Sequence, residues 1–171
     1  MGDSRAAPAE PLIANTLLQT QAVAASLPEI DQSRLTRFLG FRLTRAKVQV
    51  HRAFVKHLSA WELRATEYSV LVLVDANPGV YLRQLASALD ISPPNLVPVL
   101  DKLAKRQLIV RQPGAEDRRL QSLHLTASGK SLLVRAETEV EQFEQGLEAK
   151  LSASERRYLD SALRKLGRDP A

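Results

Sequence analysis

The hydrophobic positions in the first third of the chain recur at the spacing of an α-helix. Residues 31–58 carry an apolar side chain every three or four positions, namely at Leu35, Leu39, Leu43, Ala46, Val50 and Phe54. This spacing predicts one long helix of roughly 25 residues, whose first turn Asp31 or Ser33 can cap. A second apolar stripe includes Phe38 and Phe41. A helix covered on more than one face is typical of a dimer interface, so we expect it to join two copies of the chain.

The segment before this helix has a weaker pattern. Residues 1–11 hold three alanines and two prolines without periodicity, which indicates a mobile tail. Residues 12–27 have apolar positions that suit a short amphipathic helix ending near Pro28, but a loosely ordered arm also fits them. We therefore treat residues 1–30 as an N-terminal arm.

Three shorter helices are predicted in the middle of the chain. Residues 65–79, ATEYSVLVLVDANPG, are rich in β-branched side chains, but their length and the closing turn favour a buried helix over a strand. A short amphipathic helix follows at residues 81–91. The third helix has Ser92 as its cap and Pro93 at the first helical position, where proline is tolerated. Its inward-facing positions are Leu96, Val99, Leu100 and Leu103.

A β-hairpin is predicted directly after these helices. The apolar run at residues 108–110 is separated by a Pro-Gly turn from the alternating sequence LQSLHLT at residues 120–126. Two short helices joined by a turn and followed by a hairpin constitute a winged helix-turn-helix. The sequence thus predicts a mainly α fold with a small β-hairpin.

Two more helices complete the predicted fold. Thr126 or Ser128 caps a long helix to about Leu147, and a last helix runs from a cap at residues 152–155 to Gly167. Together with the long first helix they flank the winged helix, as in a dimeric winged-helix protein. The predicted division is an arm at residues 1–30, a dimerisation helix at 31–62, a winged helix-turn-helix at 63–127 and C-terminal dimerisation helices at 128–171.

The composition excludes several classes of site. The 171 residues are 44% apolar and 25% charged, which is ordinary for a globular domain. The absence of cysteine excludes disulfides, thiolate zinc sites and cysteine nucleophiles. No apolar run approaches the roughly 20 residues that cross a bilayer, and the N-terminus lacks the basic and apolar segments of a signal peptide. We expect a cytoplasmic protein without membrane contact.

The charged and polar residues favour binding over catalysis. The formal net charge of +5 is by itself weak evidence for a polyanionic partner. The three histidines, His51, His57 and His124, have no metal-ligand spacing, and the seven scattered glycines form no phosphate-cradling loop. We therefore expect no enzymatic activity, no metal and no cofactor.

Residues 82–129, LRQLASALDISPPNLVPVLDKLAKRQLIVRQPGAEDRRLQSLHLTASG, resemble the MarR (multiple antibiotic resistance regulator) family of winged-helix transcription factors. The residues that carry the resemblance are Leu85 and Ala86 in the first helix, residues 99–103 at the end of the recognition helix, Asp117, Arg118 and Arg119 in the wing, and Leu125, Thr126 and Gly129 before the last long helix. The sequence Asp-Arg-Arg is common on its own, but it is specific to the family when it lies between the helix-turn-helix pattern before it and the Leu-Thr and Gly pattern after it. Through the flanking helices, the resemblance extends over most of residues 33–167.

This resemblance implies a homodimer that binds a palindromic operator in double-stranded DNA, usually as a repressor, and is often released by a small aromatic ligand. The chain resembles the branch that controls aromatic or N-heteroaromatic acid catabolism, which implies a benzoate-like or pyridine-carboxylate-like effector. One departure is Pro98, which stands midway along the recognition helix where many relatives carry Arg or Ser. A proline there removes a backbone hydrogen bond and can kink the helix. The alternative is a winged-helix module for protein interaction without sequence-specific DNA binding.

The resemblance assigns DNA contacts to the wing and the recognition helix. One of Arg118 and Arg119 would enter the minor groove while Asp117 braces the other; alternatively, an Asp–Arg pair only holds the hairpin. Asn95 suits adenine, whereas Ser92 either contacts DNA at the helix N-terminus or only caps the helix. The predicted DNA-binding residues are Arg83, Ser92, Asn95, Lys102, Arg111, Arg118 and Arg119, with Lys105, Arg106 and Gln112 as further phosphate candidates. For each helix cation, a solvated surface charge is the alternative.

A ligand site is predicted where the long first helix and the next helix meet the winged helix. A planar aromatic acid needs an aromatic wall and one cationic or imidazole partner. His51 is the first choice because it lies among Val48, Val50 and Phe54, with ordinary packing or surface exposure as its alternative. The other candidates are Arg42, Arg45, Trp61, Tyr68 and Ser69, of which Trp61 also suits a packing role.

Overall fold

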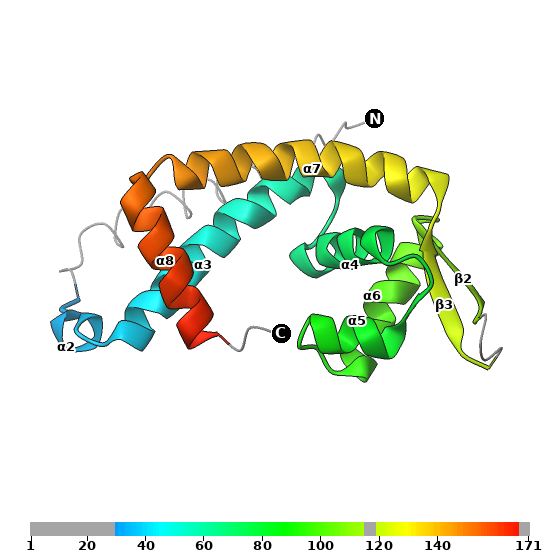
Figure 1. Cartoon of the computed structure of the whole chain (residues 1–171), viewed down its shortest axis with the longest axis horizontal. Helices are drawn as coiled ribbons and strands as arrows, with labels where there is room; N and C mark the ends of the chain where they lie inside the picture. The colour runs from blue at the N-terminus through cyan, green and yellow to red at the C-terminus, as the bar shows by residue number, and fades with distance from the viewer. Residues whose placement is uncertain (1–29, 115–118, 168–171) are drawn as a thin grey trace, which may run out of the picture. The chain divides into compact units, whose positions relative to one another are not determined.

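The computed structural model describes residues 30–114 and 119–167 (Figure 1). The chain divides into two compact units at the boundary between Arg45 and Ala46, which falls inside helix α3 (Leu39–Leu58). The predicted helix at residues 12–27 lies outside the described residues.

The first unit holds α2 (Ser33–Thr36) and the start of α3, so the prediction of one continuous helix was wrong. The N–H of Phe38 bonds to the carbonyl of Leu35, three residues back, and this tight turn ends α2 before α3 begins. Apolar spacing continues across the interruption, which is why the pattern did not reveal it. The N-cap of α2 is Gln32, not the predicted Asp31 or Ser33, although the carboxylate of Asp31 accepts from the backbone N–H of Ser33 at 2.8 Å.

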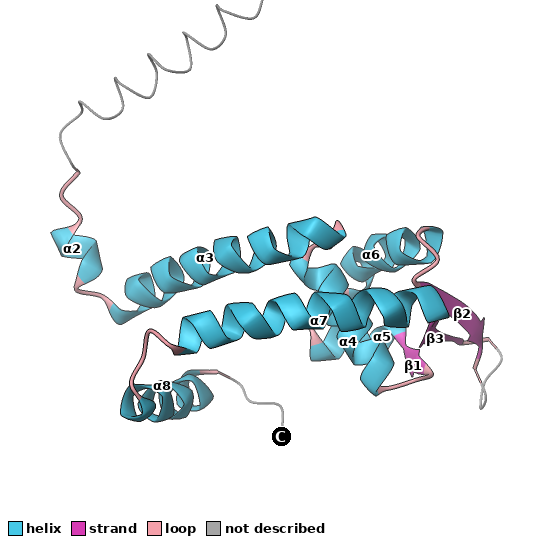
Figure 2. Cartoon of the chain, turned by 90° about the horizontal axis from the view of Figure 1, so that it is seen from above, coloured by secondary structure: helices cyan, strands magenta, loops and turns pink. Residues whose placement is uncertain are grey.

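The second unit contains the predicted winged helix-turn-helix. Its elements in chain order are the end of α3, a 3₁₀ turn η1 (Ser59–Trp61), α4 (Ala65–Ala76), β1 (Val80–Tyr81), α5 (Leu82–Ala88), α6 (Pro93–Lys105), β2 (Ile109–Pro113), β3 (Gln121–Leu125), α7 (Ala127–Glu148) and α8 (Ala153–Leu166). Figure 2 shows the three strands grouped beside α5 and the first turns of α7. The predicted fold class, mainly helical with a small β element, is confirmed.

Helix α4 belongs to the centre of the hydrophobic core. Its β-branched sequence resembles a strand, but Val70, Leu71 and Val74 are buried in a helix, as the length of the segment predicted. Leu85 of α5 and Leu100 of α6 are buried in the same cluster. Full burial of a side chain of this size contributes about 1.5–3 kcal/mol. The core therefore holds both helices of the helix-turn-helix in fixed positions.

The sheet has three antiparallel strands in the order β1-β3-β2, one more than the predicted hairpin. Strands β2 and β3 form that hairpin, with Ile109 opposite Leu125. Strand β1 joins β3 by pairing Val80 with Leu123. Because β1 is only two residues long, it shows no alternation that a sequence pattern can detect.

Helix α6 continues through Pro98, where a weakened or kinked helix was expected. The carbonyl of Pro94 lacks the donor that Pro98 would otherwise supply, but both residues are exposed and water can complete the bond. The inward face is intact because Leu96, Leu100 and Leu103 remain buried. Pro98 therefore does not break the recognition helix.

Side-chain caps begin both C-terminal helices at the predicted places. Thr126 accepts from the N–H of Gly129 at 2.9 Å, so it is the cap of α7 rather than Ser128. Ser152 and Glu155 form a reciprocal capping box at the start of α8. Such a cap stabilises a helix by about 1 kcal/mol.

Gly129 permits a close backbone approach between α7 and the winged helix. A Cβ at this position would overlap the carbonyl oxygen of Leu108, so we expect Gly129→Ala to lower the free energy of unfolding by about 1–3 kcal/mol or more. Gly146→Ala is the matched control in the same helix: a Cβ there meets no atom, and the change should stabilise by about 0.5–1 kcal/mol. Chemical denaturation at one protein concentration measures both. Equal stability of the two variants would contradict this packing.

Candidate nucleic-acid interface and effector site

Helix α6 separates a buried face from an exposed face. Its apolar side packs into the core, and the opposite side presents to solvent Asn95, Val97, Pro98, Asp101 and Lys105. In a helix-turn-helix, the second helix enters the major groove of DNA. The exposed face of α6 is therefore the candidate reading surface, and it includes Asn95 as predicted.

The N-terminus of α6 presents the hydroxyl of Ser92. This residue occupies the N-cap position but makes no side-chain cap bond. Pro93 and Pro94 fill the first two helical positions and have no N–H to donate, while the N–H of Asn95 bonds to the Ser92 carbonyl at 2.9 Å. The Ser92 side chain therefore does not make the hydrogen bond that a purely capping role requires. An exposed hydroxyl at the N-terminus of a helix suits a phosphate group.

Arg83 of α5 lies near the same N-terminus. Arg83, Asp90 and Ser92 line one open hollow of about 380 Å³ between α5 and α6. The structure therefore brings two of the predicted DNA-binding residues together from different helices. A cation beside a helix N-terminus is an arrangement that positions a DNA phosphate.

Two other predicted phosphate contacts have partners within the protein. The ammonium of Lys102 donates to the carboxylate of Glu67 at 2.7 Å. The guanidinium of Arg106 donates to the carbonyl oxygens of Trp61 and Glu62, at 3.1 and 2.8 Å. Sequence spacing had grouped both cations with the exposed Lys105. In the structure, Lys102 and Arg106 differ from Lys105 because both bond to residues that lie about 35–45 positions earlier in the chain.

The Glu67 side chain is only 3% exposed, and its carboxylate accepts two hydrogen bonds. Burial raises its pKa, but hydrogen bonds from Lys102 and from the backbone N–H of Arg64 outweigh burial and bring the pKa below its usual value. Removing one partner from such a pair would leave the other charge uncompensated.

The base of the wing is linked to α6. Arg111 of β2 forms an ion pair with Asp101 on the exposed face of α6. The hydroxyl of Ser122 in β3 donates to the carbonyl of Gln112 at 3.2 Å. An exposed ion pair contributes at most about 1 kcal/mol. The ion pair with Asp101 nevertheless places the predicted contact Arg111 beside the candidate reading surface.

The tip of the wing is only partly described. Arg119 precedes β3 and is exposed. Arg118 and Asp117 lie outside the described residues, so the predicted Asp–Arg brace does too.

Val97 is a candidate contact that the sequence did not reveal. It is 39% exposed on the reading surface, two residues after Asn95. An apolar side chain in the major groove can contact a thymine methyl group. The available signal was that Leu96, Leu100 and Leu103 already complete the buried face of α6, which leaves Val97 outside it.

An aromatic cluster joins α3, α4 and α7 in the second unit. Phe54 contacts Tyr68 edge-on at 5.8 Å between ring centroids and Phe143 at 5.7 Å. His57 lies 5.3 Å from the Phe143 ring and 3.9 Å from a carboxylate oxygen of Glu139. Partial burial and carboxylates on α7 raise the pKa of Tyr68. Tyr68, a predicted ligand residue, is thus part of an aromatic wall.

The aromatic cluster does not include four of the other predicted ligand residues. His51 is exposed on α3, and Ser69 donates to the carbonyl of Ala65 within α4. Arg42 belongs to the first unit, as does Arg45. The histidine that joins the aromatic cluster is His57 instead of His51. The two lie three residues on either side of Phe54, so helical periodicity could not choose between them.

Trp61 has the environment of a packing residue. The guanidinium of Arg135 lies 5.1 Å from the centre of its ring, a cation–π contact between η1 and α7. Its buried indole nitrogen has no hydrogen-bond partner among the described residues.

A cavity of about 490 Å³ opens between the second half of α3 and α7. Its lining residues are Gln49, Val50, Ala53, His57, Gln142, Phe143, Gly146, Leu147 and Lys150. The cavity combines the ring of Phe143 with the imidazole of His57 and the ammonium of Lys150. These are the aromatic wall and cationic partner that a planar acid requires.

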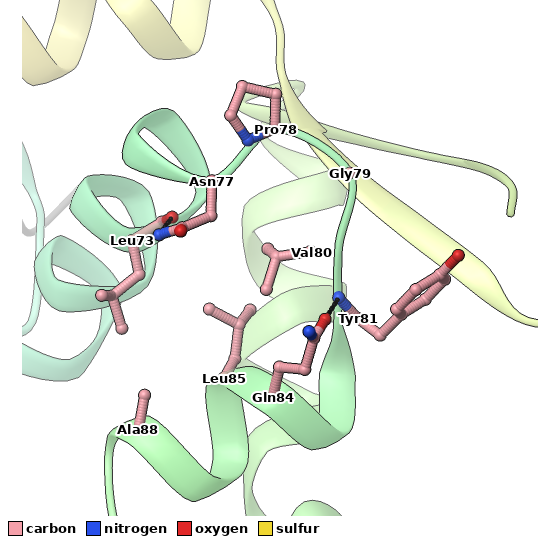
Figure 3. Close-up of a pocket in the computed structure, with 9 residues that line it drawn as sticks. All are labelled: Leu73, Asn77, Pro78, Gly79, Val80, Tyr81, Gln84, Leu85 and Ala88. Atoms are coloured by element: carbon pink, nitrogen blue, oxygen red, sulfur yellow. Dashed lines mark hydrogen bonds between the residues drawn. The ribbon is translucent and has the colours of Figure 1, made fainter. Parts of the chain in front are cut away.

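A second hollow of about 440 Å³ lies between the end of α4 and α5 (Figure 3). Its amides are already bonded within the protein: Asn77 donates to the carbonyl of Leu73, and Gln84 accepts from the N–H of Tyr81. No charged side chain lines it, so it offers no cation to a carboxylate. Its lining therefore suits an aromatic acid less well than the lining of the cavity beside His57.

Neither a metal centre nor a membrane span is found in residues 30–114 and 119–167. No group of three or more histidine, aspartate or glutamate side chains there is placed to hold a metal ion. No helix within these ranges is both long enough and apolar enough to cross a bilayer.

Comparisons with known proteins agree with the geometry. The family model described as MarR family matches residues 63–120, which run from the start of α4 to the wing. The transcriptional regulatory protein named for the hcr operon of Thauera aromatica is 32% identical over 145 residues, which span 84% of this chain and 87% of that protein. The chain belongs to the MarR family. Its relatives are transcriptional regulators, which confirms the prediction of a regulator rather than an enzyme.

Solved structures of MarR-family regulators have the same fold. The transcriptional repressor CouR bound to a 23-mer DNA duplex is 36% identical, with a TM-score of 0.76 over 81% of this chain and 99% of that chain. CouR bound to p-coumaroyl-CoA is 34% identical, with a TM-score of 0.75 over 82% of this chain and 99% of that chain. The MarR-family protein Rv2887 of Mycobacterium tuberculosis in complex with salicylic acid is 28% identical, with a TM-score of 0.60 over 76% of this chain and 96% of that chain.

Proposed function

We propose that this MarR-family chain is a homodimeric repressor that binds a palindromic DNA operator and is released by a small aromatic acid or its CoA thioester. The observation that carries the DNA-binding part is the exposed face of α6, which presents Asn95 and Val97 while its other face is fixed in the core. The protein-interaction alternative depended on Pro98, and α6 continues through that residue.

In the proposed complex, α6 lies in the major groove. Asn95 reads an adenine edge, and Val97 contacts a thymine methyl group. Ser92 and Arg83 hold a phosphate at the N-terminus of α6, and Arg111 contacts the backbone nearby. Arg118 or Arg119 enters the adjacent minor groove, where the negative potential attracts a guanidinium.

The proposed dimer uses the helices outside the winged helix, with residues 31–62 and 128–171 as its dimerisation segments. Helix α8 carries the exposed apolar side chains Leu159, Leu163 and Leu166 at helical spacing, with 44%, 51% and 59% exposure. A groove of about 650 Å³ beside it is lined by five apolar and five charged side chains, the apolar ones being Val50, Leu147, Leu151, Leu159 and Leu163. Apolar surface of this kind favours association with a second copy.

The proposed effector site is the cavity beside His57. The carboxylate or thioester end of an aromatic acid would face Lys150 and His57, with its ring against Phe143. Support for this chemical class comes from CouR, whose structure holds p-coumaroyl-CoA, and from Rv2887, whose structure holds salicylic acid. Benzoate-like and pyridine-carboxylate-like acids remain the proposed free ligands.

The direct test is fluorescence anisotropy of the purified chain with the DNA upstream of its own gene. We expect a dissociation constant on the order of 10⁻⁸–10⁻¹¹ M, weakening steeply with salt. Benzoates, pyridine carboxylates and aromatic acyl-CoA thioesters are then added one by one, and one class should release the DNA. Equal affinity for an unrelated duplex would favour the protein-interaction alternative. Release by none of these ligands would reject the effector.

A further inference from the structure

The end of the recognition helix is linked to η1, the residue that follows it and the first turn of α4 by three side-chain hydrogen bonds. Lys102 bonds to Glu67, and Arg106 bonds to the carbonyls of Trp61 and Glu62. Glu62 has a left-handed backbone conformation, with φ of 51°, where the chain turns toward α4. The two cations thus join the last turns of α6 to a constrained part of the scaffold.

The chemistry of this link differs from that of a surface ion pair. The Glu67 side chain is 3% exposed, and its second oxygen accepts from the backbone N–H of Arg64 at the start of α4. Lys102 therefore completes the hydrogen bonding of a buried carboxylate, while its own side chain is 45% exposed. Moving Lys102 to a DNA phosphate would leave that carboxylate buried without its cation, which is unfavourable.

We propose that Glu67 is a positioning residue for the recognition helix: it binds the Lys102 ammonium, fixes the last turns of α6 against α4, and withholds this lysine from DNA. The proposal rests on the proposed DNA-binding function. It replaces the direct contact predicted for Lys102 with an indirect role. Specificity depends on how accurately α6 presents Asn95 and Val97, so the link acts on base reading rather than on phosphate attraction.

The three possible roles of Lys102 give different results in a binding assay. Loss of a positioning residue lowers the affinity for the operator relative to unrelated DNA and leaves the salt dependence unchanged. Removal of a phosphate-binding cation lowers both affinities and reduces the slope of log K against log salt by about 0.9 per subunit. A merely structural role lowers stability. In the protein that remains folded, it changes neither the specificity ratio, which is the affinity for the operator divided by that for unrelated DNA, nor the slope of log K against log salt.

The test uses Lys102→Met and the double variant Glu67→Gln/Lys102→Met. The single variant leaves a buried carboxylate without its cation, so its stability should fall; the double variant removes both charges and should regain most of that stability. We expect both variants to lose about tenfold in the ratio of operator to unrelated-DNA affinity, with an unchanged slope, because both lack the bond between Lys102 and Glu67. Lys105→Met is the control, because it removes an exposed charge from the same helix and leaves the Glu67 bond intact.

A slope reduced by about 0.9 per subunit in both Lys102 variants would overturn the inference and restore the direct phosphate contact. An unchanged specificity ratio in the folded double and single variants would overturn it in favour of a purely structural role. Failure of the unmodified chain to prefer its operator would instead overturn the proposed function itself, which separates the two outcomes.

Discussion

Replacing Arg118 and Arg119 together by alanine is expected to abolish specific operator binding while the dimer persists. If one wing arginine per subunit enters the minor groove, each contributes about 1.5–3 kcal/mol in charged hydrogen bonds, so the dimer loses roughly 10²–10⁴-fold in affinity. The slope of log K against log salt should also fall, by about 0.9 for every phosphate that the variant no longer neutralises. Anisotropy titrations at several salt concentrations measure both quantities.

The charge-preserving variant Arg118→Lys/Arg119→Lys is the matched control for this experiment. It retains the electrostatic attraction but loses the planar guanidinium, so its affinity should lie between those of the alanine variant and the unmodified chain. Size-exclusion chromatography verifies that both variants remain dimers. Unchanged affinity of the alanine variant would reject the wing as a DNA contact and leave the Asp–Arg pair as a hairpin brace.

Replacing Leu163 by aspartate is expected to give a monomer that no longer binds the operator. Leu163 is 51% exposed in the apolar stripe of α8, and a charge there would be buried without a partner at the proposed interface. A monomer holds only one half-site, so operator affinity should fall by at least roughly 10³-fold, towards the level of non-specific binding. Sedimentation equilibrium and anisotropy report the two effects separately.

Ser161→Asp is the control for the dimer experiment. Ser161 lies two residues before Leu163, on nearly the opposite face of α8, so it introduces the same charge outside the apolar stripe. This variant should remain dimeric and bind the operator normally. A dimeric Leu163→Asp protein would show that α8 does not form the interface.

The sequence predicted the winged helix-turn-helix well because the signals for its elements are local and strong. The Pro-Gly turn, the two prolines at the start of α6 and the caps at Thr126 and Ser152 each define an element boundary. Apolar spacing then identified the buried face of α6, and the opposite face was therefore expected to be exposed. Asn95 was placed on that exposed face for the same reason, and Ser92 was placed at the N-terminus of α6 by the two prolines that follow it.

The features that the sequence missed depend on contacts between distant residues. Lys102 and Lys105 look alike on a helical wheel, and only the approach of Glu67 from α4 separates them. His51 and His57 are symmetric about Phe54, and the position of Phe143 on α7 decides between them. The interruption between α2 and α3 depends on a single turn that leaves the apolar spacing intact.

Hydroxyl-radical footprinting of the purified chain on the DNA upstream of its gene tests the proposed dimer on a palindrome most directly. Two recognition helices and two wings held by a two-fold dimer should protect two symmetric half-sites, with centres about 10 base pairs or a multiple of that apart. The flanking minor grooves should be protected as well, and that protection should disappear in the Arg118→Ala/Arg119→Ala variant. A single unpaired protected segment, or no protection at concentrations that saturate CouR-like repressors, would contradict a two-fold DNA-binding regulator.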